Sequence, residues 1–257
     1  EYFEALDEPM LENSRTEYLL ENPRKIINKV PSPDIPMDYS VNPYQGCEHG
    51  CTYCYARTTH QYWGMSAGLD FERKIVVKEN AAELLKEELS KKNWECKPIM
   101  LSGNTDCYQP AERKFGITRK MLQVMAEMKQ PVGIITKNSL VLRDLDILSE
   151  MAKDNLVRVN MSITTLDEEL RRVMEPRTST STQRLDAVER LTRVGIPVNV
   201  MIAPIIPGLT SDEVVPLIKA AAAAGAVSAG FTMVRLNGTI GDIFTDWIRK
   251  NLPDRAE

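Results

Sequence analysis

Short apolar segments rich in β-branched residues alternate with longer segments of helical periodicity along most of the chain. The short segments are predicted strands, and they are Tyr39–Tyr44, Pro98–Ser102, Val132–Thr136, Val157–Ile163, Pro197–Ala203 and Ala226–Val234. Regular alternation of strands with helices is typical of βα units around a parallel sheet. Six such units are too few for a closed eight-stranded barrel. The pattern therefore predicts an α/β fold, a partial (βα)6 TIM-like barrel with its active site at the carboxyl ends of the strands.

The segments between these strands carry apolar residues at helical spacing. One helix is predicted from residues 80–83, whose sequence Asn-Ala-Ala-Glu has the pattern of a capping box. Apolar stripes at the same spacing predict three more helices, over residues 117–128, 145–151 and 185–191. The last helix is expected to begin near Ser211 and to end at Gly225, because glycine is favoured just after a helix.

Residues 1–38 differ from the rest of the chain, being polar and interrupted by Pro31, Pro33 and Pro36. Prolines at this density disfavour regular helices and strands. We therefore expect an irregular N-terminal arm over residues 1–38 and one barrel domain over residues 39–257. The chain begins at Glu1 rather than at methionine, so we also expect residues to be missing from one or both ends.

The composition, 43% hydrophobic and 26% charged over 257 residues, argues against wholesale disorder. No apolar run approaches the ~20 residues needed to cross a bilayer, so no membrane association is expected. The formal net charge of −4 provides no global attraction for nucleic acid. Binding to nucleic acid would need a local basic patch, and none stands out in the sequence.

Three of the five cysteines, Cys47, Cys51 and Cys54, lie within eight positions in a loop after the first predicted strand. This distribution is a poor disulfide framework and favours a reducing, cytoplasmic setting. Thiolates bind iron–sulfur clusters or zinc, and the C-x3-C-x2-C spacing lets one loop wrap a single centre. Three cysteines leave one iron of a 4Fe–4S cubane open for a small molecule. The sequence therefore favours an iron–sulfur cluster that binds and reduces a ligand.

The alternative is a structural zinc loop in a non-catalytic metal-binding protein, completed by His60 or Cys96. Zinc sites usually pair two ligands with two rather than placing three in one loop, which disfavours this interpretation. His49 and His60 are accompanied by no serine or metalloprotease motif, so they do not indicate a hydrolase.

The cysteine spacing, with Tyr53 just before the last cysteine, is the hallmark of the radical S-adenosylmethionine (SAM) superfamily. The chain resembles the spore photoproduct lyase-like branch of this superfamily, whose C-x-Y-C-Y arrangement matches residues 51–55. Further similar segments follow in the same order, at Ile135–Lys137, Met161–Ile163, Glu175–Ser179 and Ala203–Ile205. Together they cover roughly residues 40–210.

The resemblance implies a 4Fe–4S cluster on Cys47, Cys51 and Cys54 and reductive cleavage of SAM to a 5′-deoxyadenosyl radical. That radical abstracts a hydrogen from the substrate. An external electron donor, such as flavodoxin or ferredoxin, is implied as well.

The resemblance also implies which residues contact the methionyl end of SAM. Thr105 and Asp106 match such a position, although the usual G-G-E motif is replaced here by residues 102–106, Ser-Gly-Asn-Thr-Asp. Lys137 matches a lysine that contacts the cofactor carboxylate, and a cation complements that charge. The alternatives are a turn or helix N-cap for Asp106 and a solvated loop lysine for Lys137.

The adenosine half of the cofactor is assigned in the same way. Ser162 matches a ribose contact, and the backbones of Ala203 and Tyr53 match adenine contacts. Glu175 and Arg177 lie in a similar segment and either face the pocket or pair with each other.

Cys107 is a candidate hydrogen donor, because it follows the second predicted strand, where the loops of such barrels reach the active site. A thiol has a weak S–H bond and can return a hydrogen atom to a substrate radical, with Tyr108 or Tyr55 as relays. The photolesion enzymes of the branch carry their cysteine at the position of Gly103, so Cys107 would be a displaced equivalent. The alternative is a small buried residue that packs the loop.

The substrate stays open among a nucleic acid, a peptide and a small molecule. Repair of a DNA lesion, as in spore photoproduct lyase, is one alternative. Gly103 and the acidic balance of the chain do not favour it.

Overall fold

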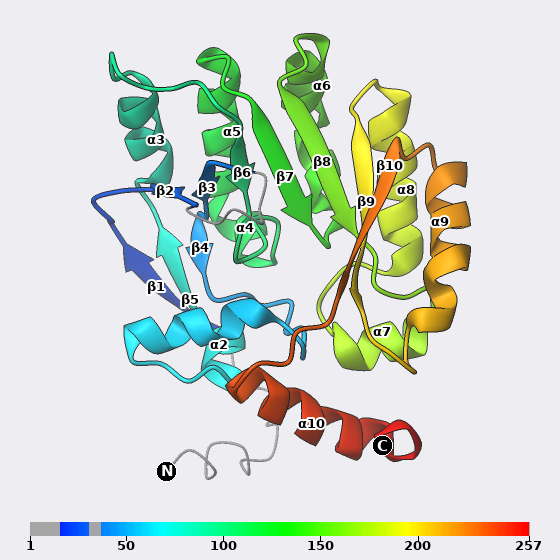
Figure 1. Ribbon diagram of the computed structural model, residues 1–257. Helices are drawn as coiled ribbons and strands as arrows, with labels where there is room; N and C mark the ends of the chain where they lie inside the picture. Colours follow the sequence, from blue (N-terminus) through cyan, green and yellow to red (C-terminus); the bar gives the residue numbers. More distant parts are fainter. Residues whose placement is uncertain (1–15, 31–36, 257) are drawn as a thin grey trace.

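The computed structural model describes residues 16–30 and 37–256, in which a large open sheet is covered by helices (Figure 1). The main sheet has seven strands in the order β10-β9-β8-β7-β6-β3-β2. Its parallel strands are β3 (Tyr39–Val41), β6 (Ile99–Leu101), β7 (Val132–Thr136), β8 (Val157–Ser162), β9 (Val198–Ile205) and β10 (Ser228–Met233). Within the main sheet, each of these six strands pairs with the next one along the chain, as consecutive βα units require. The predicted α/β fold with a parallel (βα)6 arrangement is confirmed, and within the described residues the sheet stays open.

One face of the main sheet carries the apolar core. The helices that cover it are α3 (Ala81–Leu89), α5 (Ile117–Glu127), α6 (Leu145–Lys153), α8 (Ser181–Arg193) and α9 (Val214–Ala223). Successive side chains of a strand point to opposite faces. On β8 and β9, Val159 and Val200 are buried against these helices.

The opposite, inner face of the sheet is polar and partly open to solvent. Asn160 and Asn199 lie on it and are half-buried. Asn199 Nδ2 donates to Asn160 Oδ1 at 3.1 Å, and Ser228 Oγ donates to Asn199 Oδ1 at 3.0 Å. A row of hydrogen-bonded side chains thus crosses β8, β9 and β10 on the inner face.

A smaller, three-stranded sheet joins the N-terminal segment to the cysteine loop. In it β1 (Glu17–Glu21) pairs parallel with β5 (Lys74–Lys78), and β5 pairs antiparallel with β4 (Tyr44–Gln45). In the main sheet, β2 (Ile27–Lys29) pairs antiparallel with β3. The irregular arm expected over residues 1–38 is therefore wrong for β1 and β2, because distant partner strands supply their pairing. The three prolines of that prediction lie outside the described residues.

Two local predictions also differ from the structure. The strand predicted over Tyr39–Tyr44 is divided into β3 and β4, because Pro43 lacks the N–H that a continuous ladder needs. The capping box predicted at Asn80 does not form: α3 begins at Ala81, but the Asn80 amide donates to Pro23 O at 3.2 Å instead. A capping box is present at α8, between Thr180 and Gln183.

The remaining helices lie near the carboxyl ends of the strands or connect elements. They are the α-helices α2 (Leu69–Arg73), α4 (Ala111–Phe115), α7 (Glu168–Met174) and α10 (Thr239–Asn251), and the 3-10 helices η1 (Tyr55–Trp63), η2 (Ser139–Asp144), η3 (Ser211–Glu213) and η4 (Pro253–Arg255). The expected start near Ser211 is thus a 3-10 turn that leads into α9, and Gly225 follows that helix with φ +87°. Among the described helices, none combines the length and hydrophobicity needed to traverse a lipid bilayer.

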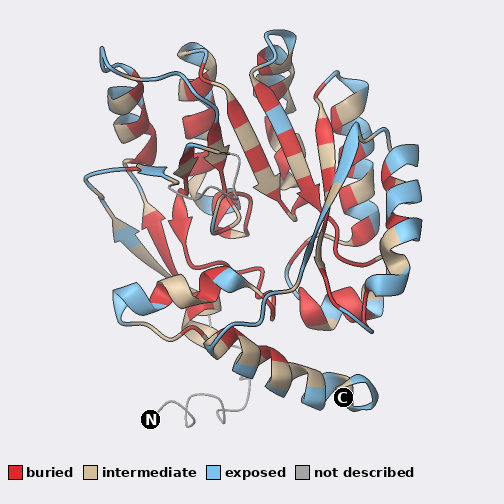
Figure 2. Ribbon diagram, viewed as in Figure 1, coloured by how far each residue is buried: buried red, intermediate tan, exposed pale blue. Residues whose placement is uncertain are grey.

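The C-terminal helix α10, which the sequence pattern did not predict, leaves the last strand without a cover. It runs across the end of the molecule that holds the cysteine loop (Figure 1) and packs Phe244 and Trp247 against a cluster that includes Cys51 and Tyr53. In consequence β10 is exposed along most of its length (Figure 2), and Phe231 is 68% exposed.

Candidate active site

The three clustered cysteines lie in one loop that leaves β4 at the carboxyl ends of the parallel strands. Backbone hydrogen bonds shape this loop: Cys47 N donates to Phe71 O at 2.8 Å, Gly50 N to Cys47 O at 3.4 Å and Cys54 N to Cys51 O at 3.3 Å. Cys47 and Cys51 are buried, Cys54 is half-buried, and all three thiols are free. One short loop therefore gathers three soft ligands.

This donor set fits a 4Fe–4S cluster better than a zinc ion. No group of three His, Cys, Asp or Glu side chains converges on a single ion within residues 16–30 and 37–256. A cubane does not require such convergence, because each of its cysteines binds a different iron. The fourth ligands proposed for zinc also lie elsewhere: His60 Nε2 is 3.0 Å from Lys74 O, and exposed Cys96 lies beside Gln130.

Without a bound cation the loop favours neutral thiols. Burial raises the pKa of Cys47, Cys51 and Cys54, that of Cys51 to about 12. The charges of Asp106 on Cys47 and of Glu175 on Cys51 add to this effect. Thiolates become the stable form when a cationic metal centre binds them. The loop is thus built to hold metal-bound thiolates rather than free ones.

Two glycines allow the loop to pass close to its neighbours. Gly46 and Gly50 have φ angles of +80° and +69°, which other residues rarely adopt. A Cβ atom on Gly50 would lie 2.6 Å from Arg177 Nη2. Arg177 in turn holds the loop, because its backbone N donates to His49 O at 3.3 Å and its Nε donates to Glu48 O.

Asp106 and His49 connect the cysteine loop to the ends of β6 and β7. His49 is almost fully buried, with Nδ1 3.4 Å from Asp106 Oδ2 and Nε2 3.2 Å from Asn138 Nδ2. Asp106 also accepts hydrogen bonds from Lys137 N at 2.7 Å and Thr136 Oγ1 at 2.8 Å. Burial alone would raise the pKa of Asp106, but His49 and the backbone N–H groups of Lys137 and Tyr108 lower it.

Both oxygens of Asp106 are therefore occupied by protein donors, and one of these is Tyr108 N, as in the turn that was the alternative for this residue. Thr105 is buried as well and donates its hydroxyl to Tyr44 O at 2.6 Å. Their contacts with the methionyl end of SAM stay a prediction. The sequence did not lead us to predict a role for His49, although its position between Cys47 and Cys51 could have indicated one.

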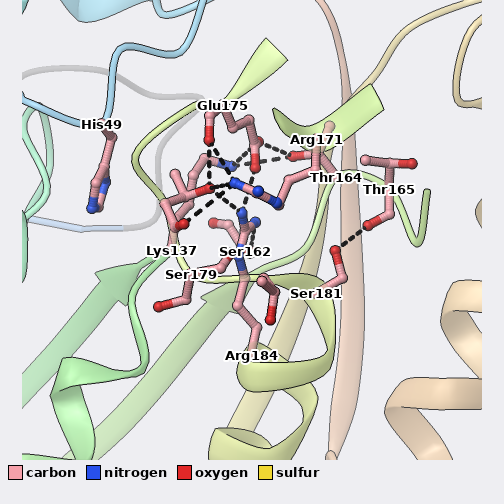
Figure 3. A network of polar contacts seen from close by, with 12 residues as sticks. His49, Lys137, Ser162, Thr164, Thr165, Arg171, Glu175, Ser179, Ser181 and Arg184 are labelled. Atoms are coloured by element: carbon pink, nitrogen blue, oxygen red, sulfur yellow. Dashed lines mark hydrogen bonds and ion pairs between the residues drawn. The ribbon is translucent and has the colours of Figure 1, made fainter. Parts of the chain in front are cut away.

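A buried carboxylate, Glu175, organises the other side of the site (Figure 3). Its Oε2 pairs with Arg184 Nη2 at 2.6 Å, and its Oε1 pairs with Lys137 Nζ at 3.1 Å. The hydroxyls of Tyr53 and Thr164 also donate to it. Burial alone would raise the pKa of Glu175, but Arg184 and Lys137 hold it well below its usual value.

The charges of this network do not cancel. One carboxylate faces two cations, and Arg184 is 1% exposed whereas Lys137 is 15% exposed. Lys137 is thus the more solvent-exposed of the two cations. Its Nζ donates to Ala203 O at 3.4 Å and lies 5.6 Å from the centroid of the Tyr53 ring. Three predicted cofactor contacts therefore meet at one place with an excess positive charge.

Ser162 belongs to the same region, since Arg184 Nη1 donates to its carbonyl at 3.0 Å. Glu175 and Arg177 do not pair with each other. Glu175 serves the buried network, whereas Arg177 pairs with Glu72 and with the cysteine loop.

A family model for the radical SAM superfamily matches residues 41–221, which include the cysteine loop and the Glu175 network. The chain belongs to the radical SAM superfamily. It is a radical SAM enzyme, and its cofactors are a 4Fe–4S cluster and SAM.

Relatives of this radical SAM enzyme occur in distant organisms. An uncharacterised protein of Mycobacterium tuberculosis is 35% identical over 90% of this chain and 69% of its own length. An uncharacterised protein of Methanocaldococcus jannaschii is 31% identical over 78% of this chain and 72% of its own length. A structure of a spore photoproduct lyase variant with bound AdoMet and dinucleoside spore photoproduct has a TM-score of 0.67 and 18% identity. That similarity covers 93% of this chain and 67% of the lyase chain, and it shows a shared fold.

The three candidates for hydrogen transfer differ in burial in this radical SAM enzyme. Cys107 is fully buried in the main core, which favours its packing role over a donor role. Tyr108 is also fully buried and directs its hydroxyl to Asp144 Oδ2 at 3.0 Å. Tyr55, in contrast, is 61% exposed, and its hydroxyl donates to Gly103 O. The structure therefore places two of the candidates in the core and one at the surface, and their catalytic roles stay untested.

Proposed function

We propose that Cys47, Cys51 and Cys54 hold the 4Fe–4S cluster at which this enzyme cleaves SAM. The observation that carries the proposal is the position of the loop: three free thiols lie at the carboxyl ends of the strands, beside the excess positive charge of Lys137. When bound and reduced, the cluster supplies an electron to the sulfonium of SAM, and the resulting 5′-deoxyadenosyl radical removes a hydrogen atom from the substrate.

The protein's own residues position the cofactor in this proposal. Lys137 binds the carboxylate of the cofactor, because the single carboxylate of Glu175 does not neutralise both Lys137 and Arg184. Ser162 meets the ribose, and the backbones of Tyr53 and Ala203 meet the adenine. Thr105 and Asp106 act mainly by ordering the loops, and they place the methionyl end.

The substrate is proposed only as an organic molecule that reaches the inner face of the sheet. Likeness to spore photoproduct lyase supports the fold, and Gly103 offers no thiol where the photolesion enzymes carry one. We therefore do not extend the proposal to DNA lesions. As partner we propose a one-electron donor such as flavodoxin or ferredoxin. The five free cysteines and an oxygen-sensitive cluster suit a reducing, cytoplasmic setting.

The test is anaerobic reconstitution of Cys→Ala variants at the three positions. We expect each variant to lose its iron and its visible absorption, and the wild-type protein to form 5′-deoxyadenosine slowly when reduced without substrate. Cys96→Ala is the matched control, because Cys96 is exposed and far from the loop in sequence. A colourless wild-type protein with stoichiometric zinc would contradict the proposal, as would full iron in any of the three loop variants.

A further inference from the structure

A surface pocket of about 290 Å³ lies directly behind the cysteine loop. Its lining includes Arg113 of α4, Asn138, Arg177, Ser179 and Gln183 of α8. None of the seven lining residues is acidic, and six of them carry polar side chains. We call it the Arg113–Arg177 pocket. Its composition is that of a site for a negatively charged group.

Two of the lining residues bind the segment that separates Cys47 from Cys51. Arg177 binds that segment twice, through its backbone N to His49 O and through Nε to Glu48 O. Asn138 reaches it from the other side, with Nδ2 3.2 Å from His49 Nε2. Two residues that line the pocket therefore hold the cysteine loop in place, although no residue of the loop itself lines the pocket.

The lining of the pocket carries two cations, Arg113 and Arg177, and no carboxylate. Arg57 and Arg177 share the single carboxylate of Glu72, which leaves one positive charge. Arg113 is exposed and has no ion pair among residues 16–30 and 37–256, so it adds another. The protein as a whole has a formal net charge of −4, and against that background the pocket is a local exception. An acidic macromolecule approaching this protein is attracted to this side.

We propose that the Arg113–Arg177 pocket is the docking site of an acidic electron-carrier protein. This rests on the proposed function, because the carrier's target is the cluster on Cys47, Cys51 and Cys54. In the step, one electron leaves the reduced carrier and enters the oxidised cluster, and no atoms are transferred. The inner side of the loop faces the region where Lys137, Tyr53 and Ala203 meet, which SAM and the substrate occupy. The carrier therefore approaches from the outer side of the loop, where Arg113 and Arg177 line the pocket.

Cations at the rim of such an interface act mainly on the rate of association, and salt weakens them. Arg113 suits a test because it lines the pocket without holding the loop. The control is Arg190→Glu, since Arg190 is an exposed arginine on α8 that pairs with Asp186 and does not line the pocket. Both substitutions change the net charge by the same amount.

The experiment follows bleaching of the reconstituted cluster in an anaerobic stopped-flow instrument. Reduced flavodoxin is the reductant in one arm, reduced ferredoxin in a second, and dithionite in a third. For Arg113→Glu we expect the second-order rate constant with at least one carrier protein to fall about tenfold or more at low salt. That loss should shrink as salt is added, whereas reduction by dithionite and SAM cleavage driven by it stay unchanged. Arg190→Glu should reduce at nearly the wild-type rate with every reductant.

Other results overturn the docking site. Equal slowing by Arg113→Glu and Arg190→Glu would show only an effect of net charge. No slowing with either carrier would place docking elsewhere, and slower SAM cleavage with dithionite would give Arg113 a different role. In each of these cases the cluster is present and the proposed function stands. A wild-type protein that takes up no cluster would refute both proposals.

Discussion

Glutamine in place of Glu175 should destabilise the protein strongly, before any cofactor is bound. The carboxylate is completely buried and pairs with Arg184, whose side chain is 1% exposed. Glutamine keeps the volume and one acceptor oxygen, but its NH2 group must face either the guanidinium of Arg184 or the ammonium of Lys137. Removing one partner of a buried ion pair costs about 3–5 kcal/mol, because the other charge is left buried without compensation. We expect a loss of that size in the free energy of unfolding at pH 7.

The loss should depend on pH in a defined direction. Arg184 and Lys137 lower the pKa of Glu175 in the folded protein, whereas an unfolded glutamate titrates near ~4.3. A carboxyl whose pKa is lower in the folded state stabilises the protein above the unfolded value, and this contribution is lost as pH falls toward the folded value. The difference between wild type and Glu175→Gln should therefore be largest near neutral pH and should narrow below pH ~4.

The assay is urea unfolding of the cofactor-free protein, followed by circular dichroism at several pH values. Glu169→Gln is the control, because Glu169 is 81% exposed and its pair with Arg172 is a surface pair. Exposed pairs contribute about 0–1 kcal/mol, so the control should stay close to wild type. The reasoning is refuted if Glu175→Gln is no less stable than Glu169→Gln at pH 7, or if its deficit is the same at every pH.

Three further predictions concern single positions. Lys137→Ala should weaken SAM binding by about 1.5–3 kcal/mol, measured calorimetrically on the reconstituted protein, but should leave binding of decarboxylated SAM unchanged. Equal losses for both ligands would refute the carboxylate contact. Cys107→Ala should lower stability by about 1 kcal/mol without changing SAM cleavage or product, since the thiol packs the core; altered product would instead support hydrogen donation. Gly50→Ala should reduce iron content after reconstitution, because its Cβ would collide with Arg177 at a positive φ; unchanged iron would show that the loop adapts.

The parallel core of the fold could be predicted because each strand carries its own signal. Buried β-branched residues such as Val159 and Val200 mark a strand whatever it pairs with. The strands β1 and β2 carry no such signal, since their residues are exposed or half-buried, and only distant partners hold them in place. The position of α10 was not predictable either, because this helix packs against the cysteine loop, which is distant from it in the sequence.

The candidate site could be predicted where chemistry depends on residue type and spacing. The three cysteines were predicted in this way and Lys137 was predicted through the family resemblance, and their roles stay predictions. The role of Glu175 was not predictable, because its pairing with Arg184 and Lys137 depends on three elements that meet only in the fold. The burial of Cys107 was not predictable either: its position after β6 indicated the active site, whereas its side chain lies in the core, and its catalytic role stays untested.

The uncovered strand β10 leaves one edge of the main sheet open to solvent within the described residues. A closed barrel admits only molecules small enough to enter through its mouth. Here the main sheet ends at β10 within the described residues, and the row from Asn160 to Ser228 leads along the inner face to that free edge. The inner face of this open sheet can therefore be approached from the side as well as from the carboxyl ends of the strands, which a closed barrel would not allow.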